Sequence, residues 1–91
     1  MIHECHITIA LADAEAGERV AKELHWSTSQ IERDPVLGKD SYFYLTTHDS
    51  QLARIKSRMH HASFELKEAG VNVIREKIEH IVYDTKMGGY L

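Results

Sequence analysis

The sequence predicts an α+β domain in which two helices cover one face of a four-stranded antiparallel sheet. Three observations predict this class: the periodic segments follow the order β-α-β-β-α-β, each expected helix carries one apolar stripe, and each expected strand has one apolar side. Packing both stripes against one face of a single sheet buries this apolar surface. The arrangement is the ferredoxin-like two-layer sandwich. Right-handed crossovers then place the first and third strands in the middle and the fourth beside the first.

The first strand is predicted at residues 5–9, because apolar and polar side chains alternate there. Its apolar side consists of Cys5, Ile7 and Ile9, and its other side of Glu4, His6 and Thr8. Asp13 is a good N-cap for a first helix that continues to Leu24, with apolar residues at every fourth position.

Residues 26–33 and 41–47 are predicted to form a hairpin, because residues 34–40 between them contain the strongest turn-forming chemistry in the chain. In the second of these strands Phe43 and Leu45 alternate with two tyrosines, which therefore lie on the side away from the helices. The strand at residues 26–33 is rich in Ser and Thr. On the same side as the tyrosines we expect its residues Trp26, Thr28, Gln30 and Glu32.

Asp49 or Ser50 is expected to cap a second helix, and Gly70 is a natural residue at its end. Apolar residues three or four positions apart give this helix one stripe over five turns. The stripe consists of Leu52, Ile55, Met59, Ala62, Leu66 and Ala69. Residues 71–83 are predicted as the last strand.

The facing of this last strand is ambiguous, because its apolar residues do not alternate strictly. If Ile74, Ile78 and Val82 face the core, then Glu76 and His80 also lie on the core side. That conflict predicts a β-bulge or an edge position. The other side of the strand then carries Arg75, Lys77, Glu79 and Tyr83.

The chain has 91 residues, which is room for one domain, since domains average about 100–200 residues. We expect residues 1–86 to form this domain and residues 87–91 to be a loose C-terminal tail. A hydrophobic content of 43% and a charged content of 27% exclude a disordered or collagen-like chain. No apolar run approaches the ~18 residues of a membrane helix. With no secretory signal either, we predict a cytoplasmic protein without a membrane partner.

The side of the sheet that the helices leave uncovered is the predicted site. The first and last strands are neighbours, so His6 should lie within side-chain reach of Arg75 and Lys77. Arginine offers a phosphate or carboxylate a bidentate fork, lysine a point charge, and histidine a donor that switches with pH. Neighbouring tyrosines could stack a ring of the ligand. The candidate residues for binding a small anionic ligand are His6, Arg75, Lys77, Glu79, Tyr42 and Tyr44.

Three interpretations of this side of the sheet stay open. Aromatic side chains are typical of dimer interfaces, which predicts a homodimer. The cations predict a ligand site, and alternating charges are also typical of a plain solvated strand. The first two interpretations can coexist, so we expect a dimeric binding module without a cofactor rather than an enzyme. The alternative is a phosphate-ester-processing enzyme in which His6 acts with Arg75 and Lys77.

The tripeptide His6-Ile7-Thr8 is similar to the His-x-Thr motif that two-histidine phosphoesterases carry on a strand. The resemblance implies a general acid and a general base, supplied by two such motifs on symmetric strands. The second match here, His61-Ala62-Ser63, falls within the second predicted helix, and the chain is shorter than that family requires. A symmetric dimer that supplies His6 twice would be needed to complete such a site.

Neither a metal nor a nucleic acid is expected as a partner. The chain is rich in histidine, with seven in all, and its segment His3-Glu4-Cys5-His6 resembles a cluster of metal ligands. On a strand, however, alternate side chains point to opposite sides, so one ion cannot collect all four. A single cysteine also excludes a cysteine-based zinc site. The net charge of −3 is not that of a nucleic-acid-binding domain, although the second helix carries the cations Arg54, Arg58 and His61.

Overall fold

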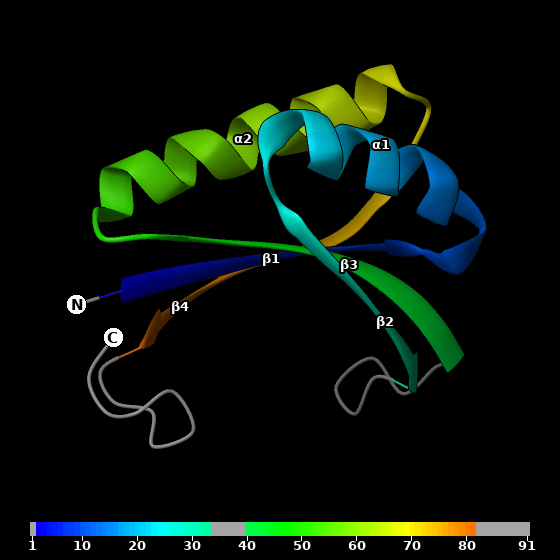
Figure 1. Ribbon diagram of the computed structural model, residues 1–91, viewed down its shortest axis with the longest axis horizontal. Coiled ribbons are helices and arrows are strands. Elements are labelled where there is room, and N and C mark those ends of the chain that lie inside the picture. Colours follow the sequence, from blue (N-terminus) through cyan, green and yellow to red (C-terminus); the bar gives the residue numbers. More distant parts are fainter. Residues whose placement is uncertain (1, 34–39, 82–91) are drawn as a thin grey trace.

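The structure, a computed structural model, describes residues 2–33 and 40–81. Some sequence predictions concern residues outside this description, namely Val82, Tyr83, the tail at 87–91 and the side chain of Glu32. The elements are β1 (Ile2–Ala10), a 3-10 turn η1 (Leu11–Asp13), α1 (Ala14–Leu24), β2 (Ser27–Arg33), β3 (Asp40–Asp49), α2 (Leu52–Glu68) and β4 (Val73–Ile81). Figure 1 shows two layers, with the helices above the sheet. The predicted order β-α-β-β-α-β is confirmed.

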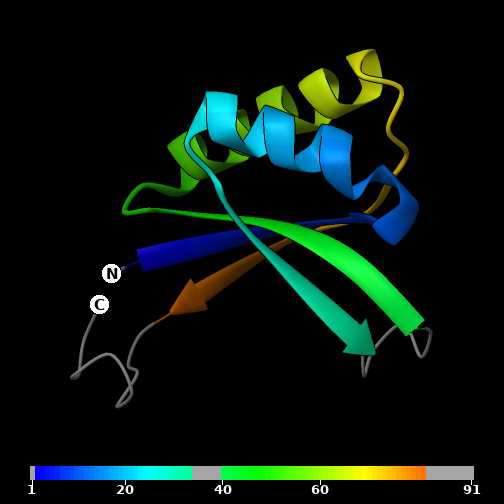
Figure 2. The ribbon, with the colours of Figure 1, turned by 45° about the vertical axis from the view of Figure 1, so that its right-hand side comes forward.

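The four strands form one antiparallel sheet in the order β2-β3-β1-β4, as the ferredoxin-like arrangement predicts. β1 is therefore a central strand, between β3 and β4. In Figures 1 and 2 both helices lie on one face of the sheet, and no described helix covers the other. We call this other side the uncovered face.

The core lies between the helices and the sheet. The largest fully buried side chains are those of Ile7, Ile9, Leu45, Ile55, Leu66 and Cys5. The predicted stripe of α2 is buried only in its middle, since Leu52 is 44% exposed and Ala69 is also exposed. The prediction is wrong at these two ends because a straight helix cannot follow a twisted sheet over its full length.

α1 approaches the sheet closely at Gly17. A β-carbon at this position would lie 2.4 Å from Cδ1 of the buried Ile9, well inside van der Waals contact. Glycine in a helix interior costs about 1 kcal/mol relative to alanine. The close approach gives a physical reason for accepting that cost here.

Trp26 lies in the core, so its predicted place on the uncovered face is wrong. The residue is 7% exposed and packs within the buried cluster. The register pairs Ser29 with Tyr44, which puts Thr28 and Gln30 on the helix side of β2 by alternation. A strand rich in Ser and Thr has no apolar alternation of its own, so the burial of the indole fixes its facing.

β4 contains the β-bulge that its sequence predicts. Thr8 pairs with Arg75 but Ile9 pairs with Val73, so Ile74 is an extra residue. Val73 packs against the core, whereas Ile74 is 39% exposed. Of the residues that the sequence left ambiguous, Ile74 does not face the core, because the bulge shifts the alternation by one residue at this end of β4.

Beyond the bulge, β4 has the predicted facing. Ile78 packs against the core. Glu76 lies on the helix side, where the hydroxyl of Ser63 donates a hydrogen bond of 2.7 Å to its Oε2. On the same side, the rings of His80 and His3 stack with centroids 4.8 Å apart. Neither helix in the described part of the chain is long and apolar enough to cross a membrane.

Candidate functional site

Rows of side chains cross the uncovered face, because residues paired between antiparallel strands point to the same side of a sheet. One row consists of Glu79, Glu4 and His48, the next of Lys77, His6, Thr46 and Ser27, and a third of Arg75, Thr8, Tyr44 and Ser29. Tyr42 lies one row further, opposite Ala10. The register therefore brings His6, Lys77 and Glu79 together, with Arg75 one row away.

His6 is held at both of its ring nitrogens. Its Nδ1 lies 2.9 Å from the hydroxyl oxygen of Thr46, and its Nε2 forms a hydrogen bond with Oε1 of Glu4. In the neutral ring, Nε2–H donates to Glu4 and the Thr46 hydroxyl donates to Nδ1. These two contacts fix the orientation of the ring on the central strand. The His6 side chain is 25% exposed.

Glu4 connects two histidines from different strands. Its Oε1 accepts from His6, and its Oε2 lies 2.6 Å from Nε2 of His48 on β3. The Glu4 side chain is only 21% exposed, so hydrogen bonds to these partners replace contacts with water. Alternation along β1 predicts Glu4 on the same side as His6, but no sequence pattern assigns it a role. Finding His48 requires the register of β1 with β3, two strands distant in the sequence, which sets it opposite Glu4.

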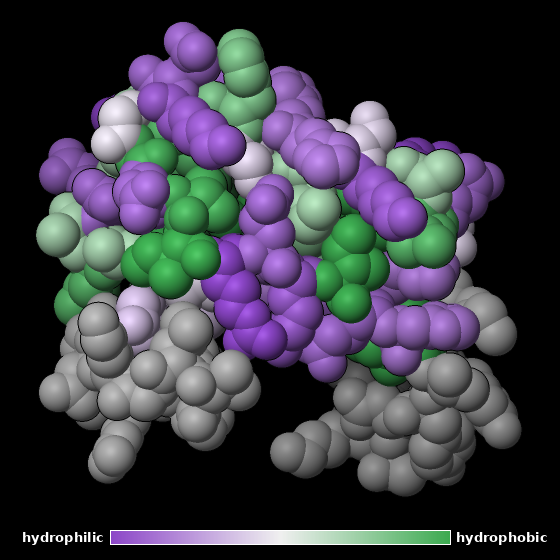
Figure 3. Space-filling view, turned by 180° about the vertical axis from the view of Figure 1, so that it is seen from behind, coloured by the Kyte–Doolittle hydropathy of each residue, from purple (hydrophilic) through white to green (hydrophobic). Residues whose placement is uncertain are grey.

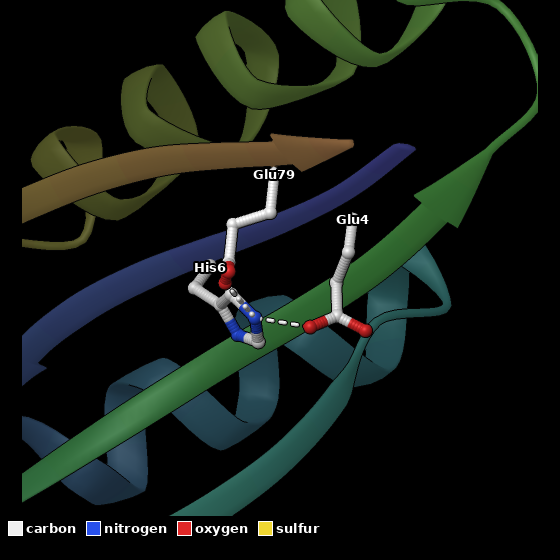
Figure 4. A group of neighbouring side chains, drawn as sticks. All are labelled: Glu4, His6 and Glu79. Carbon is white, nitrogen blue, oxygen red and sulfur yellow. Dashed lines mark hydrogen bonds and ion pairs between the residues drawn. The ribbon is translucent and has the colours of Figure 1, made fainter. Parts of the chain in front are cut away.

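Glu79 completes the cluster from β4. Its Oε1 lies 3.4 Å from Nε2 of His6 and 3.1 Å from Nζ of Lys77. The three groups Glu4, His6 and Glu79 each offer a ligand atom, and these atoms all lie within 4.8 Å of one another. Figure 4 shows the imidazole and the two carboxylates converging over the sheet. Such a set of nitrogen and oxygen atoms is chemically able to bind a metal ion.

Arg75 differs from the other charged groups of the uncovered face. Lys77 contacts Glu79, whereas Arg75 has no carboxylate within ion-pair distance in the described part of the chain. The side chain of Arg75 is half-buried beside Thr8, the residue opposite it in the register. Its guanidinium is thus a cation whose charge no described carboxylate balances.

The two tyrosines of the predicted site expose little surface. Tyr42 is 8% exposed and Tyr44 is 7% exposed in the single chain. Little of either ring is therefore open to stack on a ligand or to enter an interface. The polar groups of β1 and β4 are the more accessible part of the uncovered face.

Two cations of the predicted basic stripe on α2 are engaged within the chain. Nε of Arg54 donates to the carboxylate of Asp49 at 2.7 Å, and Arg58 donates to Oγ1 of Thr47 at 2.7 Å. The Arg54 hydrogen bond lowers the pKa of Asp49 to about 2, with a further hydrogen bond from the backbone N–H of Gln51. The N-cap of α2 is Gln51, so the prediction that Asp49 or Ser50 caps this helix is wrong. The arginines instead hold Asp49 at the end of β3.

Cys5 takes no part in the site. It lies on the helix side of β1 and is fully buried. Burial raises the pKa of its thiol to about 12, and the nearby charge of Glu76 adds to this effect. A thiol protonated at neutral pH and shielded from solvent is neither a nucleophile nor a metal ligand.

The contacts and charges of the uncovered face are the basis for assigning a function. No protein-family model matches the sequence, and a search of curated proteins finds no relative. The groups that a ligand could meet on this face are the guanidinium of Arg75, the Lys77–Glu79 pair and the cluster around His6.

Proposed function

We propose that the protein is a cytoplasmic binding module that takes a small anionic ligand at Arg75 on the uncovered face of its sheet. The observation that carries the proposal is the half-buried residue Arg75, whose guanidinium has no carboxylate partner among the described residues. A guanidinium in this state offers two parallel hydrogen bonds to a phosphate or a carboxylate. Lys77, two residues along the same face of β4, adds a second cation.

The surroundings of His6 favour the Arg75 end of this row for the anion. Glu4 and Glu79 both lie close to the imidazole, so an anion at His6 would meet two negative charges. Both ring nitrogens of His6 are also engaged. His6 therefore positions its neighbours, and Arg75 makes the direct contact with the ligand.

The side of the molecule opposite the view of Figure 1 is mixed in hydropathy. Seen from behind in Figure 3, hydrophilic side chains gather in the middle of the molecule and separate the hydrophobic patches on either side. A broad continuous apolar area, as in obligate interfaces, is not visible on this side.

The test is an NMR titration of the labelled protein with inorganic phosphate, a nucleotide and acetate. We expect amide shifts on β1 and β4 that are lost in Arg75→Ala and retained in Lys56→Ala, a matched loss of an exposed cation on α2. Binding should weaken as salt is added, because exposed charges are screened over ~10 Å at 0.1 M salt. Equal shifts in wild type and Arg75→Ala, or no shifts at millimolar ligand, would remove the proposal.

We further propose that the module is a homodimer. Among the described strands β4 pairs with β1 alone, so its outer edge is paired with none of the other described strands, and β4 carries the exposed side chain of Ile74. Light scattering at micromolar concentration should give twice the chain mass, and Ile74→Asp should shift the protein toward monomer. A wild-type protein that stays monomeric at 100-fold higher concentration contradicts this part of the proposal.

A phosphate-ester-processing enzyme is the second candidate. His6 and Thr8 do lie on one face of a central strand, as a His-x-Thr motif requires. The second match, His61-Ala62-Ser63, lies on α2, outside the sheet. Hydrolysis of a nitrophenyl phosphodiester that is lost in His6→Ala and in Arg75→Ala but retained in Lys56→Ala would favour this enzyme, in which His6 acts with Arg75 and Lys77, over the binding module.

A further inference from the structure

We propose that Glu4, His6 and Glu79 form a binding site for a divalent transition-metal ion, with Zn²⁺ as the best fit. An imidazole nitrogen with two carboxylate oxygens is a ligand set that zinc accepts in proteins. Hard cations such as Mg²⁺ and Ca²⁺ prefer all-oxygen sites, so the imidazole selects against them. The inference is independent of the anion site, because it uses none of the free cationic charge of Arg75.

The distances suit a small four-coordinate ion. Two ligand atoms each about 2.1 Å from a tetrahedral ion lie about 3.4 Å apart. Nε2 of His6 and Oε1 of Glu79 are 3.4 Å apart, and all three ligand atoms lie within 4.8 Å of one another. The ion would replace the proton that Nε2 of His6 now donates to Glu4. Figure 4 shows the carboxylates of Glu4 and Glu79 both beside the imidazole of His6, so the ion would need only a small displacement of the Glu4 carboxylate away from Nε2.

Each of the three ligands already has a partner that holds it in place. Thr46 contacts Nδ1 of His6, which leaves Nε2 as the nitrogen that faces the carboxylates. His48 contacts the outer oxygen of Glu4, and Lys77 contacts Glu79. Metal-binding histidines and carboxylates are typically oriented by such outer hydrogen bonds. The site is therefore largely formed before an ion arrives.

A second observation points to a cation at this position. Glu4 and Glu79 are directly opposite each other in the register of β1 and β4. Like charges at directly opposite positions of a sheet are destabilising. A divalent cation between the two carboxylates would attract both of them. Lys77 forms an ion pair with Glu79 but not with Glu4.

The test is calorimetric titration of the untagged full chain, stripped of metal, with Zn²⁺ alone. We expect one ion per chain, with affinity reduced at least 10-fold in Glu4→Gln and in Glu79→Gln. The matched control is Glu65→Gln, which alters the exposed histidine–glutamate pair His61–Glu65 on α2 and should leave the affinity unchanged. Far-UV circular dichroism of each variant confirms that the fold is retained.

Co²⁺ provides a second readout through its visible absorption. Wild-type protein should give the intense bands of four-coordinate cobalt, and Glu79→Gln should not. Excess Mg²⁺ should leave the bands in place. If Glu79→Gln binds Zn²⁺ as tightly as wild type, or if Glu65→Gln loses as much affinity, the ion is held elsewhere and the assignment of this site is wrong.

Discussion

Among single residues, Glu4 does most to organise the uncovered face. Its carboxylate links His6 on β1 to His48 on β3, and it lies opposite Glu79 on β4. One side chain thus connects β1 to β3 through its two histidine partners. It is also mostly shielded from solvent, so these contacts are made in an environment where charge-assisted hydrogen bonds are stronger than in water.

Thr46 is expected to orient His6 for metal binding. Replacing Thr46 by Val keeps the shape of the side chain but removes the hydroxyl that contacts Nδ1. We expect Zn²⁺ affinity to fall by about 10-fold or more, as is typical when an outer partner of a ligating histidine is lost. Calorimetry measures this change, with Thr28→Val on the exposed part of β2 as the control. Unchanged affinity in Thr46→Val would show that the ring needs no such support.

Asp49 should make the stability of the protein depend on pH in the acid range. Its pKa falls from 3.8 to about 2 on folding, chiefly through the hydrogen bond from Arg54. A carboxylate with a lowered pKa stabilises the folded state above its unfolded value, and this stabilisation is lost as pH falls toward the folded value. The urea midpoint of Asp49→Asn should therefore lie below that of wild type at pH 7. The difference should shrink between pH 4 and pH 2; a constant difference over that range would contradict the assignment.

Among the elements, α1 depends on its close approach to the sheet at Gly17. A leucine there would force its side chain against buried Ile9 and Phe43, and overpacking of this kind costs about 1–3 kcal/mol or more. Chemical denaturation of Gly17→Leu should show this loss. Glu18→Leu, at the next and exposed position of the same helix, should change stability by less than about 0.5 kcal/mol. Equal effects of the two substitutions would mean that the helix does not pack as described.

The strands differ in how well their facing could be predicted. β1 and β3 alternate strictly, so their sides follow from the sequence alone. β2 has no apolar alternation, and its facing depends on the burial of Trp26, a tertiary contact. In β4, simple alternation would put apolar Ile74 and charged Glu76 on the same side, which predicts a bulge. The position of the bulge follows from the pairing of β4 with β1. Local patterns thus predict the elements, and long-range packing fixes the exceptions.

For the whole molecule, the two-layer core is the main source of stability. Leu45 and Ile55 are fully buried on opposite layers, so either change to Ala should cost about 2–5 kcal/mol. Changing Leu52, at the exposed start of α2, to Ala should lower the free energy of unfolding by clearly less. Urea unfolding of the three variants checks this order. Similar losses at all three positions would contradict the observed packing of α2.

The candidate site was predictable only in part, because it is assembled from distant parts of the chain. Alternation alone places His6, Arg75 and Lys77 on one side of the sheet, and the register bears this out. The same alternation excludes the contiguous segment His3-Glu4-Cys5-His6 as a metal cluster. Alternation also predicts Glu79 on this side, but the close grouping of Glu79 with Glu4 and His6 depends on the register of β1 with β4.

The measurement that tests the central claim most directly follows the side-chain Nε–H resonances of the arginines during titration with inorganic phosphate. Arg54 and Arg58 serve as internal controls, because Asp49 and Thr47 already hold their guanidinium groups. We predict that the Arg75 resonance shifts and saturates, while those of Arg54 and Arg58 stay in place. If the Arg75 resonance does not move, or if all three move together, the uncovered face does not bind an anion through Arg75 and the proposed function is wrong.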